Sequence, residues 1–591
     1  MQYLQDQLQK EFLTSLQNEG YPQLTPKDIV LQKTRKEFEG EFTLVLFGLL
    51  AVFGKNILEA GNKIGQILQK NLPFIKHYEI ISGFLNLSLT DEFWVDFLLR
   101  FPEDIIDLPN SEQTYLVEFS SPNTNKPLHL GHLRNNFLGD SIARILKFQG
   151  HRVVRTQIIN DRGIHICKSM LAWQKWGGDD NPTISGMKGD KWVGKYYVLF
   201  DQVYKQEVRD LMAQGVIQEE AEKNAPILLE AQDMLKKWEQ GDLEIIALWE
   251  QMNAWVYQGF SKTYQAMGIQ FDKNYFESQT YLLGKSVVQK GLAEKVFYTQ
   301  KEGAIACDLT AEGLDEKIVQ RKDGTSVYIT QDLGTALQRA QDFPHLKSVV
   351  YVVASEQDYH FKVLFSMLKK MGYAWASACY HLSYGLVELP SGKMKSREGT
   401  VVDADELLQE LEERVQAQSE SLGKLQDLVL EERQKLYHTL ALAALKYYLL
   451  RVDPKKKILF NPEESIQLQG DTAIFVQYTY VRIKSLLKKT GYIGTFDSKK
   501  LNSSVTEKRL MQLLSEFYKT VENSAIMYNP ALLVNYLYEL VSVFNHFYQS
   551  CSVLQENDLN VRNFRIFLSR RIAQVIEKTS DLLGFSLPEK M

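Results

Sequence analysis

Apolar residues between positions 109 and 404 alternate between two spacings. Short apolar runs predict β-strands at 114–119, 153–159, 348–354 and 381–389. Apolar residues at helical spacing predict a helix over 130–148, between the first two strands, and another near 359–371. Apolar strands that alternate with helices are typical of a parallel sheet covered by helices on both faces. The region is therefore predicted to be a doubly wound, Rossmann-like α/β domain.

The two ends of the chain show other patterns. Residues 1–108 combine a helical start with a strand-like, period-two stretch at 83–89, which predicts a small α+β domain. From 405 to 591 only helical spacing recurs, which predicts an all-α helical bundle. Within the α/β domain, residues 180–300 form long polar helical sequence and are predicted to be an insertion.

The composition is that of an ordinary globular protein. The 591 residues allow about three or four domains, and 45% hydrophobic with 24% charged residues excludes a disordered or repetitive chain. The four cysteines are far apart, so neither a disulfide framework nor a zinc ribbon is expected. The longest apolar stretch is shorter than the roughly 20 residues of a membrane span, and the start has no signal-peptide core. We expect a soluble cytoplasmic protein.

Charge is distributed unevenly along the chain. The net charge is −5, yet residues 441–591 carry 20 Lys and Arg against 14 Asp and Glu. A basic C-terminal segment on an acidic chain permits a nucleic-acid contact there, although it does not require one.

The loop after the first predicted sheet strand carries candidate chemistry. It contains His129-Leu-Gly-His132 and joins a strand end to a helix start, where ligands bind in doubly wound folds. A helix N-terminus offers N–H groups and partial positive charge to a phosphate, and Gly131 lets a flat base approach the backbone. Two imidazoles there can stabilise charge that grows on a phosphoryl group. The alternative is a pair of surface histidines beside a helix cap. A zinc site is not expected, because no third ligand lies nearby in the sequence.

A second basic loop follows the last predicted strand. Gly392-Lys-Met-Lys-Ser-Arg-Glu-Gly-Thr400 has three cations between glycines, which could close over a triphosphate. The alternative is a solvated basic loop. A third stretch, Gly189-Asp-Lys-Trp-Val-Gly-Lys195, fits the P-loop spacing, but Tyr196 stands where Ser or Thr should hold magnesium and no strand precedes it. We do not expect a P-loop there.

HLGH followed far downstream by KMKSR resembles the two signatures of class I aminoacyl-tRNA synthetases. The surrounding sequence is more specific. The stretches at 118–134, 328–332, 475–485 and 582–591 resemble the pattern of arginyl-tRNA synthetases. The similarity is weakest in the N-terminal hundred residues and in the insertion.

The resemblance implies a monomeric ligase that uses ATP with substrate-borne Mg²⁺, and no zinc, to join L-arginine to tRNA(Arg) by way of arginyl-adenylate. It implies a class I catalytic domain at 109–404 and a helical anticodon-binding domain at 405–591. The N-terminal domain, 1–108, resembles the family's additional domain, which contacts the tRNA elbow. In the family, tRNA is needed even for the first step.

Site residues follow from the resemblance position by position. His129, His132 and Lys126 would be catalytic, and ATP would be bound by Pro122, Asn123, Lys126, His129, Gly131, His132, Lys393, Lys395, Ser396 and Arg397. Arginine would be bound by Glu118, Asn123, Tyr328, Asp332 and Gln357, and tRNA by Tyr480, Arg482, Lys484 and Asn545. Ser396 replaces the usual second lysine of the downstream signature, and Lys126 would compensate for it.

Three alternatives stay open at the level of sequence. The chain could be a class I synthetase for another amino acid, a small-molecule nucleotidyltransferase with the same HxGH site, or a non-catalytic tRNA-binding relative. The basic helical C-terminus disfavours the second, and the intact His129, His132 and Lys126 disfavour the third. For any single tyrosine of the 478–480 stretch, a place in the bundle core is as good an interpretation as stacking on RNA.

Overall fold

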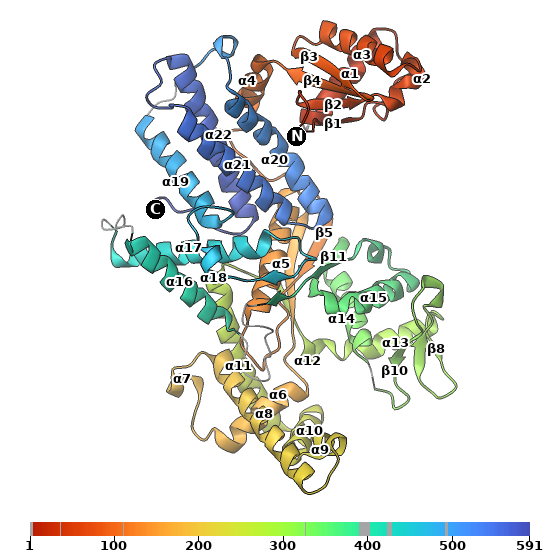
Figure 1. Ribbon diagram of the computed structural model, residues 1–591. Coiled ribbons are helices and arrows are strands. Elements are labelled where there is room, and N and C mark those ends of the chain that lie inside the picture. Colours follow the sequence, from red (N-terminus) through yellow and green to blue (C-terminus); the bar gives the residue numbers. More distant parts are fainter. Residues whose placement is uncertain are drawn as a thin grey trace.

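The computed structural model describes residues 4–35, 37–109, 111–325, 327–388, 402–421, 428–490 and 494–591. The predicted ATP contacts Lys393, Lys395, Ser396 and Arg397 lie outside the described residues. Figure 1 shows a small N-terminal domain at one end, a helical bundle beside it, and a central sheet from which a helical insertion extends.

The N-terminal domain is an antiparallel sheet covered by helices. Its strands are β1 (Leu31–Lys33), β2 (Phe42–Val45), β3 (Ile75–Ile81) and β4 (Phe84–Leu89), in the order β1-β2-β4-β3. Its main helices are α1 (Leu4–Asn18), α3 (Ile57–Asn71) and α4 (Asp91–Arg100). In α3, Gly65 lies so close to the ring of Tyr78 on β3 that an added Cβ would be 2.6 Å from it. The helix therefore packs directly on the sheet, and the predicted α+β character is confirmed.

The central sheet has five parallel strands. They are β12 (Tyr380–Tyr384), β11 (Leu346–Ala354), β5 (Thr114–Glu118), β6 (Arg152–Ile159) and β7 (Lys273–Phe276), in that order. The chain runs outward in one direction from β5 to β7 and in the other from β11 to β12. The gap between β5 and β11 is thus the topological switch point, where doubly wound folds bind ligands.

Both faces of this sheet are covered, because its strands are apolar on both sides. Val350 and Val352 of β11 pack into the core that includes α5 (Leu130–Phe148). Val349 and Tyr351, their neighbours in sequence, pack into a second core with α13 (Leu283–Ala293), α14 (Tyr328–Asp342) and α15 (Asp358–Lys370). Successive side chains of a strand point to opposite faces, so the predicted doubly wound architecture is confirmed.

The predicted insertion at 180–300 was wrong in one respect. Its helical part contains α7 (Pro182–Ser185), α8 (Gly189–Ala213), α9 (Gln218–Asn224), α10 (Pro226–Glu239) and α11 (Leu243–Met267), with α6 (Ile164–Trp176) packed against α8. However, β7 lies inside the predicted range and is the edge strand of the main sheet. Four residues are too few to display a period, and β7 is defined by its pairing with β6. A small antiparallel sheet, β8 (Tyr298–Thr299), β9 (Ile305–Cys307) and β10 (Lys317–Gln320), follows.

The C-terminal part is a helical bundle, as predicted. It comprises α16 (Ala404–Ser421), α17 (Leu430–Leu450), α19 (Ala473–Thr490), α20 (Val505–Met527), α21 (Ala531–Ser550) and α22 (Leu559–Leu582). The expectation of no strand beyond 405 was wrong at β14 (Ile458–Leu459), which pairs in parallel with β13 (Val387–Glu388). The strand is two residues long and forms only against a distant part of the chain, so no local pattern could reveal it.

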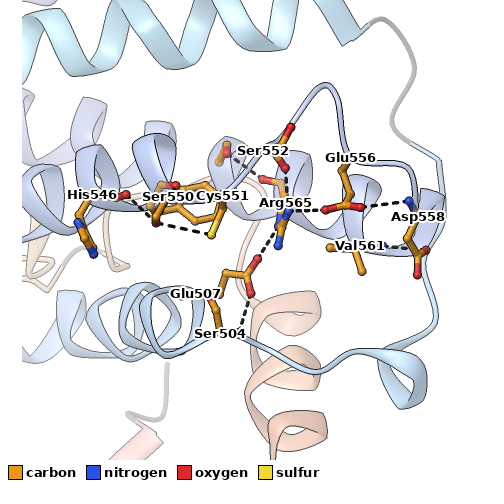
Figure 2. Close-up of polar contacts among 12 residues, drawn as sticks. Ser504, Glu507, His546, Ser550, Cys551, Ser552, Glu556, Asp558, Val561 and Arg565 are labelled. Atoms are coloured by element: carbon orange, nitrogen blue, oxygen red, sulfur yellow. Dashed lines mark hydrogen bonds and ion pairs between the residues drawn. The ribbon is translucent and has the colours of Figure 1, made fainter.

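A polar cluster fixes the bundle helices relative to one another. Arg565 of α22 donates to the carboxylate of Glu507 on α20 at 2.6 Å, to the carbonyl of Ser552 and to the carboxylate of Glu556, both at 2.7 Å (Figure 2). Glu507 also closes a capping box with Ser504 at the start of α20. One buried carboxylate therefore both caps α20 and pairs α20 with α22.

Candidate active site

The HLGH residues form the N-terminal cap of α5. His129 is the N-cap residue, and its Nδ1 accepts a hydrogen bond from the backbone N–H of Gly131 at 3.1 Å. Nδ1 of His132, one turn later, accepts a hydrogen bond from the backbone N–H of His129 at 3.2 Å. The two ring centroids are 3.9 Å apart. Each imidazole is therefore oriented by a backbone N–H of the signature itself, that of Gly131 for His129 and that of His129 for His132.

Both imidazoles are neutral. Burial lowers the pKa of His129 to about 3, with the positive charge of Lys126 as the second cause. Burial likewise holds the pKa of His132 well below its ordinary value, and the neighbouring His129 and Lys126 lower it further. Since Nδ1 of each ring is a hydrogen-bond acceptor, the single proton of each neutral ring lies on Nε2. The site thus presents two Nε2–H donors, which suit a phosphoryl group.

The loop that leads into this cap is held in an unusual conformation. Ser120 and Ser121 have φ of 67° and 47°, a left-handed region that costs a non-glycine residue about 1–3 kcal/mol. The backbone N–H of Ser120 donates to Asn135 of α5, whose amide also reaches the carbonyl of Val352 on β11. Asn135 therefore fixes the loop at the switch point.

The end of β6 holds the middle of the same loop. Asn160 donates its backbone N–H to the carbonyl of Pro122 at 2.9 Å and accepts from that of Thr124 at 3.1 Å. Pro122 is buried, whereas Asn123, between Pro122 and Thr124, is exposed.

The chain that leaves the second basic loop docks on the HLGH residues. The backbone N–H of Leu130 donates to the carbonyl of Val402 at 3.2 Å, and that of Ala404 donates to the carbonyl of Leu128 at 2.9 Å. Asp403 forms an antiparallel bridge with His129. Residue 402 directly follows the segment at 389–401, which lies outside the described residues, so the pairing places the resumption of the described chain beside the HLGH residues.

The predicted arginine contacts come from the ends of strands and the starts of helices. Tyr328 and Asp332 begin α14 one helical turn apart, and the Tyr328 side chain is 80% exposed. Nε2 of His360, from α15, lies 2.6 Å from a carboxylate oxygen of Asp332. Gln357 is the exposed N-cap residue of α15, just beyond β11.

Glu277 is a candidate site residue that the sequence did not point to. It begins α12 (Glu277–Thr280) directly after β7. Burial raises the pKa of its carboxyl to about 7, and the negative charges of Asp161 and Asp332 add to this, whereas Arg162 opposes it. Glu277 therefore lies in the electrostatic field of Asp332. A carboxylate after a sheet strand is a recognisable signal, but β7 itself had not been predicted.

The position of Glu277 is fixed through its neighbour Ser278. Asp161, which is buried at the end of β6, accepts from the backbone N–H of Ser278 at 2.8 Å and from its hydroxyl at 2.7 Å. The hydroxyl of Tyr257 on α11 also donates to Asp161, at 3.0 Å. Residues of the insertion thus help to hold the start of α12.

Glu118 has a partner that the sequence did not suggest. Its carboxylate, 6% exposed at the end of β5, accepts a charge-assisted hydrogen bond from the guanidinium of Arg339 on α14. Burial of both charges makes this pairing necessary, since an unpaired buried carboxylate would be costly. The predicted contact between Glu118 and a substrate guanidinium remains a prediction.

The predicted tRNA contacts separate into two groups. Arg482 and Asn545 line a cavity of about 640 Å³ between α16, α17, α19 and α21, together with Tyr478 and the C-terminal Met591. The Arg482 guanidinium lies 4.7 Å from the ring centroid of Tyr478 and 5.0 Å from that of Tyr548, and it donates to Asn545.

Tyr480 and Lys484 do not line this cavity. Tyr480 is 7% exposed, and its hydroxyl donates to Glu577 at 3.2 Å, which matches the alternative of a bundle-core tyrosine. The ammonium of Lys484 lies 5.7 Å from the centre of the Tyr480 ring. The roles of both residues toward tRNA remain predictions.

Within the described part of the chain, none of the helices combines the length and hydrophobicity needed to cross a bilayer. Among the same residues, no group of three or more His, Cys, Asp or Glu side chains could hold a metal ion.

Comparisons with known proteins agree with this geometry. Residues 104–461 match the family model described as tRNA synthetases class I (R), catalytic domain, and residues 476–591 match the DALR anticodon binding domain. An arginine–tRNA ligase of Flavobacterium psychrophilum is 51% identical over 583 residues, covering 96% of this chain and 97% of its own length. That of Amoebophilus asiaticus is 50% identical over 95% of this chain and 96% of its own.

A solved structure extends the comparison to the fold. The arginyl-tRNA synthetase of Thermus thermophilus superposes with a TM-score of 0.82 at 24% identity, and all of both chains is covered. Identity near one half over almost the whole length, with both domain models matched, is decisive. The chain belongs to the arginyl-tRNA synthetase family of class I aminoacyl-tRNA synthetases.

Proposed function

We propose that this chain joins L-arginine to tRNA(Arg) in two steps. In the first, the arginine carboxylate attacks the α-phosphorus of ATP in line, which gives arginyl-adenylate and releases pyrophosphate. In the second, a hydroxyl of the terminal ribose of tRNA takes the arginyl group, and AMP leaves. Such phosphoryl chemistry requires mainly positioning and charge stabilisation from the protein.

His129 and His132 stabilise the first transition state in this proposal. Their Nε2–H groups donate to the α-phosphoryl oxygens, on which negative charge grows, and neutral imidazoles need not exchange a proton to do so. Removal of one such donor commonly costs about 10²–10³ in kcat. Lys126 neutralises phosphate charge, as do the basic residues Lys393, Lys395 and Arg397 of the downstream signature.

The remaining predicted ATP contacts act through shape and backbone. Pro122, Asn123 and Gly131 form the surface on which the nucleotide lies, and Ser396 belongs to the downstream signature. Mg²⁺ enters with ATP and is coordinated by phosphate oxygens and water.

Arginine is recognised by carboxylates from two elements, α14 and the start of α12. Asp332 and Glu277 receive the guanidinium fork, because five N–H donors in one plane are best matched by carboxylate oxygens. Tyr328 and Gln357 lie beside them, and Asn123 binds the α-amino end. The shared electrostatic field of Asp332 and Glu277 supports this pocket. Because Glu118 pairs with Arg339, any contact that it makes with the arginine substrate must coexist with that pair.

The helical domain binds tRNA, with Arg482 and Asn545 in the cavity and Tyr480 and Lys484 outside it. Arg482→Lys tests the cavity, since lysine keeps the charge but loses the planar contacts to Tyr478 and Tyr548. We expect weaker binding of total tRNA in a filter assay, with the KM values for arginine and ATP unchanged. Equal binding would exclude the cavity as a tRNA-binding site.

We also propose that the N-terminal domain contacts the tRNA elbow. We propose further that the enzyme is a cytoplasmic monomer, and light scattering can check the monomeric state.

The pair of oriented, neutral imidazoles at the switch point carries the proposal. ATP–pyrophosphate exchange should be measured with each of the twenty amino acids, with and without total tRNA. Exchange with arginine alone, and only after tRNA is added, is the expected result. Exchange with another amino acid would refute the arginine pocket, and no exchange under any condition would refute the catalytic proposal.

A further inference from the structure

The stretch that fits the P-loop spacing has a different role in the structure. Residues 189–195 form the first turns of α8 in the insertion. A Cβ added to Gly189 would lie 2.1 Å from the backbone oxygen of Trp255 on α11. One added to Gly194 would lie 3.0 Å from Cδ of Pro127 and 3.6 Å from Cα of Lys126. The glycines therefore let α8 pack directly against α11 and against the loop that carries the first signature.

A partly buried lysine joins the start of α8 to the other side of the same site. Lys188, the N-cap residue of α8, has a side chain that is only 17% exposed. Its ammonium lies 3.1 Å from the fully buried carboxylate of Asp190 and also contacts the carboxylate of Asp405 and the hydroxyl of Thr263. One cation thus links the insertion to the first turn of α16.

Asp405 is connected to His129 by backbone interactions. Its N–H donates to the carboxylate of Asp403 at 2.8 Å, which caps α16. Asp403 is bridged to His129, and the residues on either side of it pair with Leu128 and Leu130. A displacement of the α16 N-terminus would therefore be passed to the backbone of the histidine cap.

We propose that Lys188 is a positioning residue for the first step of catalysis. It holds Asp405, and with it the segment at 402–405, in the position that orients His129 and so its Nε2–H donor. This inference rests on the proposed function, because the orientation of His129 matters only if that residue meets a phosphoryl group. It assigns the insertion a part in adenylate formation without any contact between its residues and the substrate.

Lys188→Met tests the role. Misplacement of a catalytic group by about 1 Å can cost about 10²-fold in rate, so kcat of arginine-dependent exchange should fall at least about tenfold. The KM for arginine should stay within about twofold, because the arginine pocket lies on other elements. Lys188→Arg, which keeps the charge, should recover most of kcat. Lys223→Met, which removes an exposed lysine paired with Glu219 in the same insertion, should leave both constants unchanged.

Asp405→Asn provides the second arm, because Asp405 is partly exposed and its loss leaves the backbone intact. Asp405→Asn should lower kcat, and the double variant should be no slower than Lys188→Met alone, since both act through one contact. Unchanged kcat in Lys188→Met and Asp405→Asn overturns the inference. A fall in kcat that Lys188→Arg does not rescue, and that comes with a clear drop in the melting temperature of Lys188→Met, also overturns it. A wild-type enzyme without arginine-dependent exchange would instead overturn the proposed function.

Discussion

The backbone N–H of Leu130 donates a hydrogen bond to the carbonyl oxygen of Val402, 3.2 Å away. Leu130 belongs to the first signature of the family, and Val402 directly follows the segment that contains the second. Two segments far apart in the sequence are therefore joined through the backbone beside the switch point of the sheet.

Replacement of His129 should separate its two roles. His129→Asn keeps a side-chain acceptor for the N–H of Gly131, because asparagine is a good N-cap, but it removes the Nε2–H donor. We expect kcat of pyrophosphate exchange to fall about 10²–10³-fold with little change in thermal unfolding. His129→Ala should lose activity similarly and also about 1 kcal/mol of stability. Equal activity of His129→Asn and wild type would show that the imidazole does not act in the transition state.

Asp332 should determine arginine binding. Asp332→Asn keeps the shape and the neighbour His360 but removes the charge that meets the guanidinium. A charge-assisted hydrogen bond contributes about 1.5–3 kcal/mol, so the KM for arginine should rise at least about tenfold with the KM for ATP unchanged. Asp323→Asn, at an exposed turn, is the matched control. Parallel changes in both KM values would place Asp332 outside the arginine pocket.

Arginine binding should weaken as pH falls through about 7. The pKa of Glu277 is raised to about 7 in the folded protein, so its carboxyl is protonated and neutral below this pH and charged above it. The neutral form cannot pair with a guanidinium, and kcat/KM for arginine should fall by up to about tenfold per pH unit below 7. The measurement is kcat/KM for arginine between pH 5.5 and 8.5.

Glu277→Gln is the control for this pH dependence. It should have a low kcat/KM that no longer changes in this window, since the titrating group is gone. A wild-type profile that Glu277→Gln reproduces in shape would assign the titration to another group.

The pair of Glu118 and Arg339 should matter for stability. Arg339→Met leaves the buried Glu118 carboxylate without its cation, and breaking one partner of a buried pair typically costs about 3–5 kcal/mol. Urea unfolding of the enzyme should show this loss. A control, Lys33→Met, breaks an exposed pair with Glu516 and should cost about 1 kcal/mol or less. If Arg339→Met is as stable as wild type, the pair is not a structural contact.

Patterns that span a few residues predicted most of the fold. The helix over 130–148 was predicted with the bounds that α5 has, because its apolar positions and its cap lie within one stretch of sequence. The strand at 114–119 and the helical character of 405–591 were predicted for the same reason. Strands β7 and β14 were missed, since each exists only through pairing with a distant segment.

The candidate site divides in the same way. The sequence by itself determined the residues of the HLGH cap, its place between a strand and a helix, and the pairing of Tyr328 with Asp332 on one helical turn, since all of these depend on neighbours along the chain. Tertiary structure alone decided that Glu277 lies near Asp332, that Glu118 faces Arg339, and that Tyr480 is buried while Tyr478 lines a cavity. Burial, proton position and charge pairing depend on what packs around a side chain, and those partners come from distant parts of the sequence.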